Sequence, residues 1–333
     1  MMGAMSPPEP ERPRTLVTAP FRGEGLDLLE SVADVILDPW IDHSPLRLYS
    51  AEQLAKRLAD EGAVIVVCEA DRCAGPVFDL PLLAVGSTRG DPTNVDVPAA
   101  TAAGVPVLRA PGRNADAVAE HSIALLFAAS RHVVPADADV RRGEIFKGGS
   151  IPYQRYRSWE LNGRTAGLVG LGAVGRATRW RLEGLGMRVL AFDPYAEDAN
   201  ATLHQVLAEA DVISLHAAVT PETSGMIGSA QFAAMKDGVI FINAARAMLH
   251  DTDALVAALQ SGKVAAAGLD HFVGEHLPPD HPLISMENVV LTPHIGGATY
   301  DTEANHSRLI ATDIARLLRG ERPHNIVNPE VLA

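Results

Sequence analysis

The chain has 333 residues, of which 47% are hydrophobic and 21% are charged. This length allows two domains with separate cores, and the composition is typical of a globular protein rather than a disordered or fibrous one. The formal net charge of −13 argues against a nucleic-acid-binding surface and against binding to anionic lipid.

The segment 1–13 is rich in proline and acidic residues and is predicted to be a disordered tail. It has neither the apolar core of a signal peptide nor the length of a membrane span. No apolar run reaches the roughly 18 residues that a membrane helix needs, so we expect no membrane partner.

Cys68 and Cys73 are too few for a disulfide framework. We therefore expect the protein in the cytoplasm.

Short apolar runs alternate with helical patterns along the chain, which predicts parallel sheets joined by crossover helices. The runs fall into two series and so predict two related α/β domains. In the first series, helical spacing covers 25–32 and 51–61. The predicted strands of this series are 15–18, 35–37, 63–68, 82–87 and 105–108.

Between the two series, the apolar segment 115–132 predicts a long helix with Asn114 as its N-cap. The arginine-rich stretch 141–162 that follows contains aromatic residues and has little periodicity. Such an excursion is interpreted equally well as a subunit contact or as a solvated loop.

The second series begins at Thr165 and has the six strands of a full dinucleotide-binding fold. Its further strands are 188–192, 211–215, 238–242, 265–269 and 289–291. A final helix is predicted at 301–319, closed by Gly320. The segment 325–329 is expected to return to the first domain.

The run 167–175 is the most informative motif of the chain. Gly170 permits a tight turn, Gly172 lets a pyrophosphate approach the backbone, and Gly175 lets the helix 173–185 pack closely on the preceding strand. About 20 residues further on, Asp193 ends the next strand, where a carboxylate would accept ribose hydroxyls. The order of strand, turn, helix, strand and acid predicts a site for NAD rather than NADP, because Asp193 would repel a 2′-phosphate.

Polar residues follow the later strands of the second series, at the sheet edge where parallel sheets bind ligands. They are His216, Asn243, Arg246, Asp270 and His294. In addition, Glu275 lies in the loop before the last strand. This loop could bring Glu275 to His294 by folding back.

Together these groups suit the oxidation of a secondary alcohol. His294 would remove the hydroxyl proton as hydride leaves, since imidazole has an unperturbed pKa of about 6.5. Glu275, bonded to the other ring nitrogen, would fix the tautomer and stabilise the imidazolium. Arg246 would bind a substrate carboxylate and polarise the neighbouring carbonyl.

From about Ala63 to its C-terminus, the chain resembles the D-isomer-specific 2-hydroxyacid dehydrogenase family, which includes phosphoglycerate dehydrogenase-like proteins. The resemblance is carried by the segments 167–175, 214–216 with 220–223, 241–246, 268–270 and 292–297. By this resemblance, the catalytic Arg, Glu and His of the family fall on Arg246, Glu275 and His294.

The resemblance also implies the domain layout, with a Rossmann NAD-binding domain at 111–299 inserted into a flavodoxin-like substrate-binding domain at 14–110 and 300–333. It further implies a homodimer formed through the NAD-binding domains. The predicted cofactor residues are Gly170, Gly172, Ala173, Val174, Gly175, Asp193, His216, Thr220, Asn243, Ala244, Asp270 and Gly296. The expected partner is a small 2-hydroxy or 2-keto acid.

The predicted substrate loop departs from the family. It reads Arg89, Gly90 and Asp91, where a glycine-valine-glycine turn is usual. Gly90 and Asp91 can still offer amides to a substrate carboxylate, while Arg89 and Asp91 add opposite charges beside it. Together with the acidic turn 69–72, this favours an unphosphorylated polyhydroxy or substituted 2-hydroxy acid over 3-phosphoglycerate.

His271 and His276 replace the valine and proline that are usual around Glu275. With His281 they recur at equal intervals, but in a proline-rich loop that lacks the short helical spacing of zinc motifs. We therefore predict no metal site there and interpret them as surface histidines.

Two other functions fit the same fold. One is a non-catalytic NAD(H)-sensing protein that acts as a corepressor, against which the complete Arg246, Glu275 and His294 set argues. The other is a dehydrogenase for formate or phosphite, although Glu275 beside His294 fits proton transfer from an alcohol better.

Overall fold

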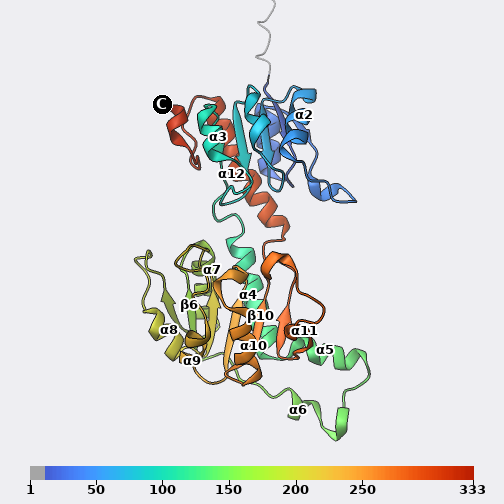
Figure 1. Ribbon diagram of the computed structural model, residues 1–333, viewed down its shortest axis with the longest axis vertical. Coiled ribbons are helices and arrows are strands. Elements are labelled where there is room, and N and C mark those ends of the chain that lie inside the picture. Colours follow the sequence, from blue (N-terminus) through green and yellow to red (C-terminus); the bar gives the residue numbers. More distant parts are fainter. Residues whose placement is uncertain (1–11) are drawn as a thin grey trace, which may run out of the picture. The chain divides into compact units, whose positions relative to one another are not determined.

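The computed structural model of the protein describes residues 12–333, so the expected tail lies outside the described residues except for Arg12 and Pro13. The described chain forms two compact units, each an α/β fold (Figure 1). One unit contains the residues up to Arg113 together with Thr299–Ala333, and the other is Asn114–Ala298.

The first unit contains a five-stranded parallel sheet with the order β2-β1-β3-β4-β5, which is the flavodoxin-like order. Its strands are β1 (Arg14–Val17), β2 (Asp34–Leu37), β3 (Ile65–Cys68), β4 (Ala84–Ser87) and β5 (Val107–Leu108). Its helices are α1 (Glu24–Val32), α2 (Ala51–Glu61), α3 (Val97–Ala102) and α12 (Tyr300–Leu318). The return at 325–329 is made through Ile326, which bridges to Leu108.

Helix α12 packs very closely against α1. A Cβ atom added at Gly25 would lie 2.3 Å from the backbone carbonyl carbon of Ser307, so only glycine allows this approach. Ile310 of α12 belongs to the same buried cluster as Val17 and Ile65 of the sheet. The C-terminal helix therefore completes the core of the first unit.

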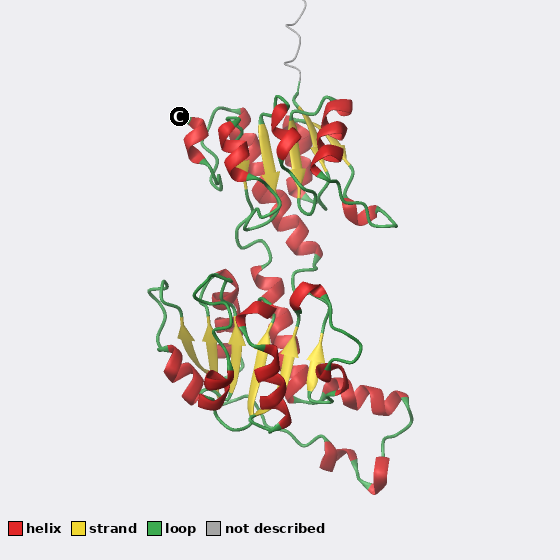
Figure 2. Cartoon of the chain, in the orientation of Figure 1, coloured by secondary structure: helices red, strands yellow, loops and turns green. Residues whose placement is uncertain are grey.

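The second unit contains a six-stranded parallel sheet with the order β11-β10-β9-β8-β6-β7 (Figure 2). Its strands are β6 (Thr165–Val169), β7 (Arg188–Phe192), β8 (Val212–Leu215), β9 (Val239–Asn243), β10 (Val264–Leu269) and β11 (Val289–Leu291). Its helices are α4 (Ala115–Ser130), α5 (Val133–Arg141), α6 (Pro152–Arg155), α7 (Ala173–Gly184), α8 (Leu203–Glu209), α9 (Ser229–Ala234), α10 (Thr252–Gln260) and α11 (Pro282–Ser285). The strand order reverses between β6 and β8, which creates a crevice at their carboxyl ends.

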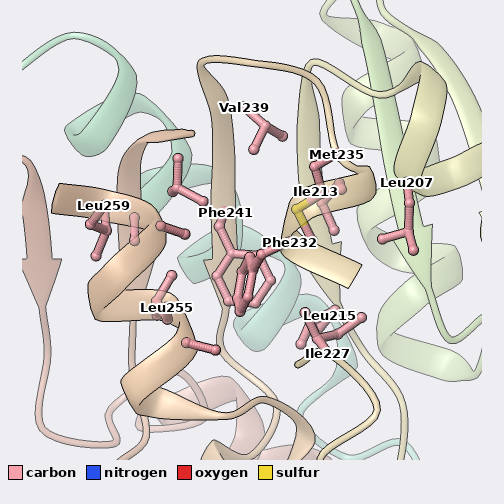
Figure 3. Close-up of a cluster of buried hydrophobic side chains, with 14 of the residues drawn as sticks. Leu207, Ile213, Leu215, Ile227, Phe232, Met235, Val239, Phe241, Leu255 and Leu259 are labelled. Carbon is pink, nitrogen blue, oxygen red and sulfur yellow. The ribbon is translucent and has the colours of Figure 1, made fainter. Parts of the chain in front are cut away.

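A large apolar cluster covers one face of this second sheet (Figure 3). At its centre, the rings of Phe232 and Phe241 meet edge to face with centroids 5.3 Å apart. Leu255 of α10 and Ile213 of β8 are fully buried in the same cluster. This packing fixes β8, β9 and β10, whose carboxyl ends carry most of the predicted site residues.

One local prediction about the connecting helix is wrong. The long helix ends at Ser130 rather than at 132, because His132 takes a left-handed conformation with φ of 55° and the chain starts α5. Asn114 occupies the N-cap position, but its side chain accepts no helix hydrogen bond. In residues 12–333, no helix combines the length and apolarity that crossing a bilayer requires.

Candidate active site

The glycine turn after β6 has the geometry that the motif predicts. Gly170 has φ of +100°, and a Cβ there would lie 2.5 Å from the backbone nitrogen of Ala217. A Cβ at Gly175 would lie 2.2 Å from the carbonyl oxygen of Gly170. In contrast, a Cβ at Gly172 would meet no atom within 4 Å. The backbone at Gly172 is therefore open to a ligand, at the N-terminus of α7.

Asp193 lies directly after β7 and closes this turn. Its two carboxylate oxygens accept hydrogen bonds from the backbone N–H groups of Leu171 (2.7 Å) and Tyr195 (2.9 Å). These bonds hold the carboxylate beside the glycine turn. The half-buried side chain is thus fixed at the place where the motif expects a ribose.

His216 follows β8 on the other side of the crevice. Its Nε2 is hydrogen-bonded with Ser214 Oγ (3.0 Å), whereas its buried Nδ1 has no partner in the described part of the chain. Burial lowers the pKa of His216 from 6.5 to about 4, so the ring is neutral at neutral pH. One buried ring nitrogen is therefore left without a hydrogen-bond partner from residues 12–333 at this end of β8.

The turn after β9 positions Arg246 through Asn243. The side-chain amide of Asn243 donates to the carbonyl of Arg246 (2.9 Å) and contacts Nδ1 of the buried His250 (3.0 Å). Its oxygen accepts from the N–H of Ala245 (3.0 Å). Arg246 itself is exposed, and no carboxylate within residues 12–333 lies within 4.0 Å of its guanidinium. A cation is thus presented by a rigid turn without an internal counter-ion.

Asp270, after β10, holds the loop that follows β11. Its carboxylate accepts hydrogen bonds from Thr292 Oγ1 (2.6 Å) and from the backbone N–H groups of Ile295 (2.9 Å) and Gly296 (2.8 Å). Burial raises the pKa of Asp270, but the hydrogen bonds from His121, Thr292 and these amides outweigh it and keep the pKa well below its usual range. The carboxylate is therefore charged, and it anchors the loop that carries His294.

His294 and Glu275 are brought together by this loop and by the 3-10 turn at Val273–Glu275. His294 Nδ1 lies 2.8 Å from Glu275 Oε1. Both residues have positive φ angles, 56° for His294 and 54° for Glu275. Residues other than glycine rarely adopt such angles. Such strained backbone is typical of functional sites, where the surrounding structure imposes it.

His271 is an additional imidazole in this place. It is 5% exposed, and its ring centroid lies 3.7 Å from that of His294. Burial, together with the nearby His294 and Arg246, lowers the pKa of His271 to about 4. The predicted surface histidine is thus a buried neutral ring in contact with His294, the two ring planes being tilted by 50°. Its interpretation as a surface residue is corrected.

Comparison with known proteins assigns this arrangement to a family. Residues 123–296 match the family model described as D-isomer specific 2-hydroxyacid dehydrogenase, NAD binding domain. The chain is 36% identical over 336 residues to the glyoxylate reductase of Thermofilum pendens, covering 96% of this chain and 96% of that protein. The chain belongs to this family.

Two further proteins are similar to this chain, one in sequence and one in structure. Identity to the D-3-phosphoglycerate dehydrogenase of Archaeoglobus fulgidus is 42% over 243 residues, covering 71% of this chain but only 45% of that longer relative. The crystal structure of D-lactate dehydrogenase with NAD+ from Lactobacillus jensenii is similar with a TM-score of 0.78 and 27% identity, covering 94% of this chain and 99% of that chain. This D-2-hydroxyacid dehydrogenase chain is accordingly an NAD-dependent oxidoreductase with a Rossmann NAD-binding domain.

The residues of this dehydrogenase fit NAD. The open backbone at Gly172, the fixed carboxylate of Asp193 and the unpartnered Nδ1 of His216 surround the crevice where the strand order reverses. Ala173 and Val174 form the first turn of α7 beside it. Thr220 lies in the exposed loop after β8, and Ala244 is buried after β9.

The predicted substrate loop belongs to the first unit of the dehydrogenase. Arg89 donates to the carbonyl of Glu69 (2.7 Å) and to Thr93 Oγ1 (3.0 Å), so its guanidinium is held against the loop. Gly90 is half-buried and Asp91 is exposed. The structure thus places Arg89, Gly90 and Asp91 in one turn after β4.

Sequence reasoning missed three positioning residues, His121, Thr292 and His250. His121 Nε2 lies 3.0 Å from Thr292 Oγ1, which in turn binds Asp270. A signal was present, since His121 lies on the helix face of the buried Val118 and Leu125. For His250 no spacing rule gave a hint.

Proposed function

We propose that this chain transfers a hydride between NAD and a D-2-hydroxy acid/2-keto acid pair, with His294 as acid and base. The single observation that carries this proposal is the 2.8 Å contact between His294 Nδ1 and Glu275 Oε1. It gives one imidazole a fixed orientation at the carboxyl end of the NAD-binding sheet.

The Glu275 contact determines which nitrogen of His294 reacts. With Nδ1–H donated to Glu275, the lone pair of the neutral ring is on Nε2. Nε2 would take the hydroxyl proton of a 2-hydroxy acid, and the Glu275 carboxylate would stabilise the imidazolium that forms. In the reverse direction the same Nε2–H would protonate the developing alkoxide of the keto acid.

Arg246 is proposed to bind the substrate carboxylate. Its guanidinium can form two parallel hydrogen bonds with a carboxylate, and within the described chain it has no acidic partner to displace. Arg89, Gly90 and Asp91 are proposed as further substrate-binding residues. The cofactor would be held by the Gly170–Gly175 turn and by Asp193, and when bound it supplies or accepts the hydride.

His294→Ala tests the assigned role. We expect kcat to fall by at least ~100-fold, because the proton transfer is lost, while NADH affinity measured by fluorescence stays within twofold of the wild-type value. His276→Ala, an exposed histidine of the neighbouring loop, is the control and should retain turnover. Activity that is merely scaled down together with lost NADH binding would refute the role of His294.

The substrate is proposed to be an unphosphorylated polyhydroxy or substituted 2-hydroxy acid. In support, the turn after β3 contains two carboxyl groups. Glu69 forms an ion pair with Arg113, and the buried Asp71 accepts a hydrogen bond from Thr18 Oγ1. Loss of NADH absorbance against glyoxylate, hydroxypyruvate, larger polar keto acids and 3-phosphohydroxypyruvate ranks the substrates. Silence on the whole panel with intact NADH binding would favour the sensing role.

A homodimer is proposed to form through the NAD-binding unit. Support comes from the excursion 133–159, which exposes large apolar side chains that a monomer would bury. They are Val133, Val134, Val140, Ile145, Phe146, Ile151, Tyr153 and Trp159. Sedimentation velocity of the wild type and of Phe146→Asp would test this.

The cytoplasm is the proposed location. Cys68 and Cys73 are buried free thiols, which fits a reducing compartment.

A further inference from the structure

His271, Glu275 and His294 bring three potential metal ligands together, with ligand atoms all within 4.8 Å of one another. We propose that they form a binding site for a divalent transition ion, Zn²⁺ being the best suited, and that an ion bound there blocks proton transfer by His294. The inhibitory effect rests on the proposed function, whereas the binding of the ion does not.

The two distances from Glu275 to the imidazole nitrogens bracket the spacing of a tetrahedral ion, and the third separation is at most 4.8 Å. Bond lengths of about 2.0–2.2 Å place the ligands of tetrahedral Zn²⁺ roughly 3.3–3.5 Å apart. Glu275 Oε1 lies 2.8 Å from His294 Nδ1 and 3.8 Å from His271 Nδ1, values on either side of that spacing. Small rotations of the exposed Glu275 side chain would therefore equalise the two separations. Three protein ligands leave one coordination position for water.

The chemical state of the ligands also favours binding. Two imidazole nitrogens and one carboxylate oxygen form a set of ligand atoms that binds Zn²⁺ in preference to Mg²⁺ or Ca²⁺, which favour oxygen ligands. Burial keeps the pKa of His271 at about 4, so this ring is neutral at neutral pH and has a free lone pair. The guanidinium of Arg246 opposes a cation, but the carboxylates of Asp270 and Glu275 face the same ring and offset it.

Metal binding would change the tautomer of His294. With Nδ1 in contact with Glu275, Nε2 has the lone pair that acts as base. An ion on Nδ1 requires the lone pair there, so the single proton of the neutral ring moves to Nε2. Nε2 then cannot accept the hydroxyl proton, and Glu275, now a metal ligand, no longer stabilises an imidazolium. Inhibition is therefore expected in both directions of the reaction.

The other histidines of the loop are not part of this site. His276 is exposed, and Nδ1 of His281 accepts a hydrogen bond from the N–H of Leu283 at the start of α11 (3.2 Å). The equal sequence intervals of the three loop histidines are thus irrelevant to binding. Only His271 approaches Glu275 and His294, which makes His276 a matched control.

The test uses the full chain, stripped with a chelator. Zn²⁺ binding is followed by calorimetry, and Co²⁺ binding by the visible absorption of tetrahedral cobalt, in the wild type, His271→Val, Glu275→Gln and His276→Val. We expect one ion per chain in the wild type and in His276→Val. His271→Val and Glu275→Gln should each weaken Zn²⁺ binding by at least ~10-fold. Turnover of the wild type should be inhibited by Zn²⁺ at the same concentrations and restored by EDTA.

Equal Zn²⁺ affinity in the wild type, His271→Val and Glu275→Gln would overturn the proposal, as would the absence of any metal binding. Unfolding midpoints of the variants show whether His271→Val is folded. If it is not, the Zn²⁺ affinity of Glu275→Gln, a substitution at an exposed side chain, decides whether the site exists. Binding that depends on His271 in a protein without turnover would refute the proposed function and leave the metal site standing. Turnover without any metal binding would refute the metal site and leave the proposed function standing.

Discussion

Single glycines decide whether the NAD-binding crevice can form. Gly170 is required by the protein itself, because its φ is +100° and a Cβ would collide with the backbone of Ala217. Gly172 is different, since a Cβ there would touch nothing within 4 Å. The motif therefore contains two glycines that the fold requires, Gly170 and Gly175, and a third, Gly172, that leaves space for the ligand.

Two alanine substitutions should separate these roles. Gly170→Ala should lower the free energy of unfolding by at least ~2 kcal/mol, because of strain and a backbone clash. Gly172→Ala should leave the thermal midpoint unchanged and weaken NADH binding by at least ~10-fold, because the methyl group would occupy the space of the pyrophosphate. Calorimetry and NADH titration of both variants check this. A destabilised Gly172→Ala protein would contradict the assignment.

Some contacts among the site residues could be predicted from the sequence and others could not. The pairing of His294 with Glu275 was predicted from their positions after and before the last strand, and the family resemblance implied the same two residues. The structure has the pair at 2.8 Å. The contact of His271 with His294 was not predicted, because the sequence gives spacing along the chain but not the direction in which a loop side chain points. His271 was expected at the surface and is buried.

At the scale of elements, predictions succeeded where local signals act at both ends. Helix α2 spans Ala51–Glu61 as predicted, because Ser50 and Gln53 form a capping box and Gly62 is left-handed with φ of 62°. The helix starting at Ala115 was predicted too long, since no glycine or proline marks the break at His132. Strand β5 begins at Val107 rather than at 105, after Pro106, which has no N–H to give to a neighbouring strand.

The loop after β11 depends on one buried carboxylate. In Asp270→Asn, an amide N–H would face the N–H donors of Ile295 or Gly296, so we expect a loss of about 2–3 kcal/mol of unfolding free energy. Turnover should fall more than NADH affinity, since the loop carries His294. Asp237→Asn, at an exposed aspartate, should leave both unchanged. Chemical denaturation measures the loss of stability, and steady-state kinetics measure turnover. An unfolding midpoint of Asp270→Asn equal to that of the wild type would refute the anchoring role.

At the scale of the whole molecule, the two sheets follow from the sequence because strand and helix patterns alternate without interruption. The strand orders agree with the Rossmann and flavodoxin-like folds that the family resemblance implies. Each unit also contains a buried histidine outside the proposed chemistry, His306 in the first and His250 in the second. Their neutral rings connect stability to pH.

Stability should decrease as the solution is acidified. Burial lowers the pKa of His306 and of His250 from 6.5 to about 4. Between these two pH values the unfolded chain binds a proton at each histidine, whereas the folded protein does not. The stabilisation is complete above pH 6.5 and is lost as pH falls from about 6.5 toward 4. At pH 5 each histidine should cost about 2 kcal/mol relative to pH 7. Urea denaturation at both pH values tests this, with a smaller pH effect in His306→Gln. Equal stability at the two pH values would contradict it.

The position of α12 determines an order of events during synthesis. Strands β1 to β5 leave the ribosome before the second unit, yet the helix that covers Gly25 and Gly86 is made only after residue 299. The second unit is one continuous segment and can reach its native state while the first is still incomplete. Throughout that interval the nascent chain displays an uncovered apolar sheet, and this is the stage at which a chaperone would be needed.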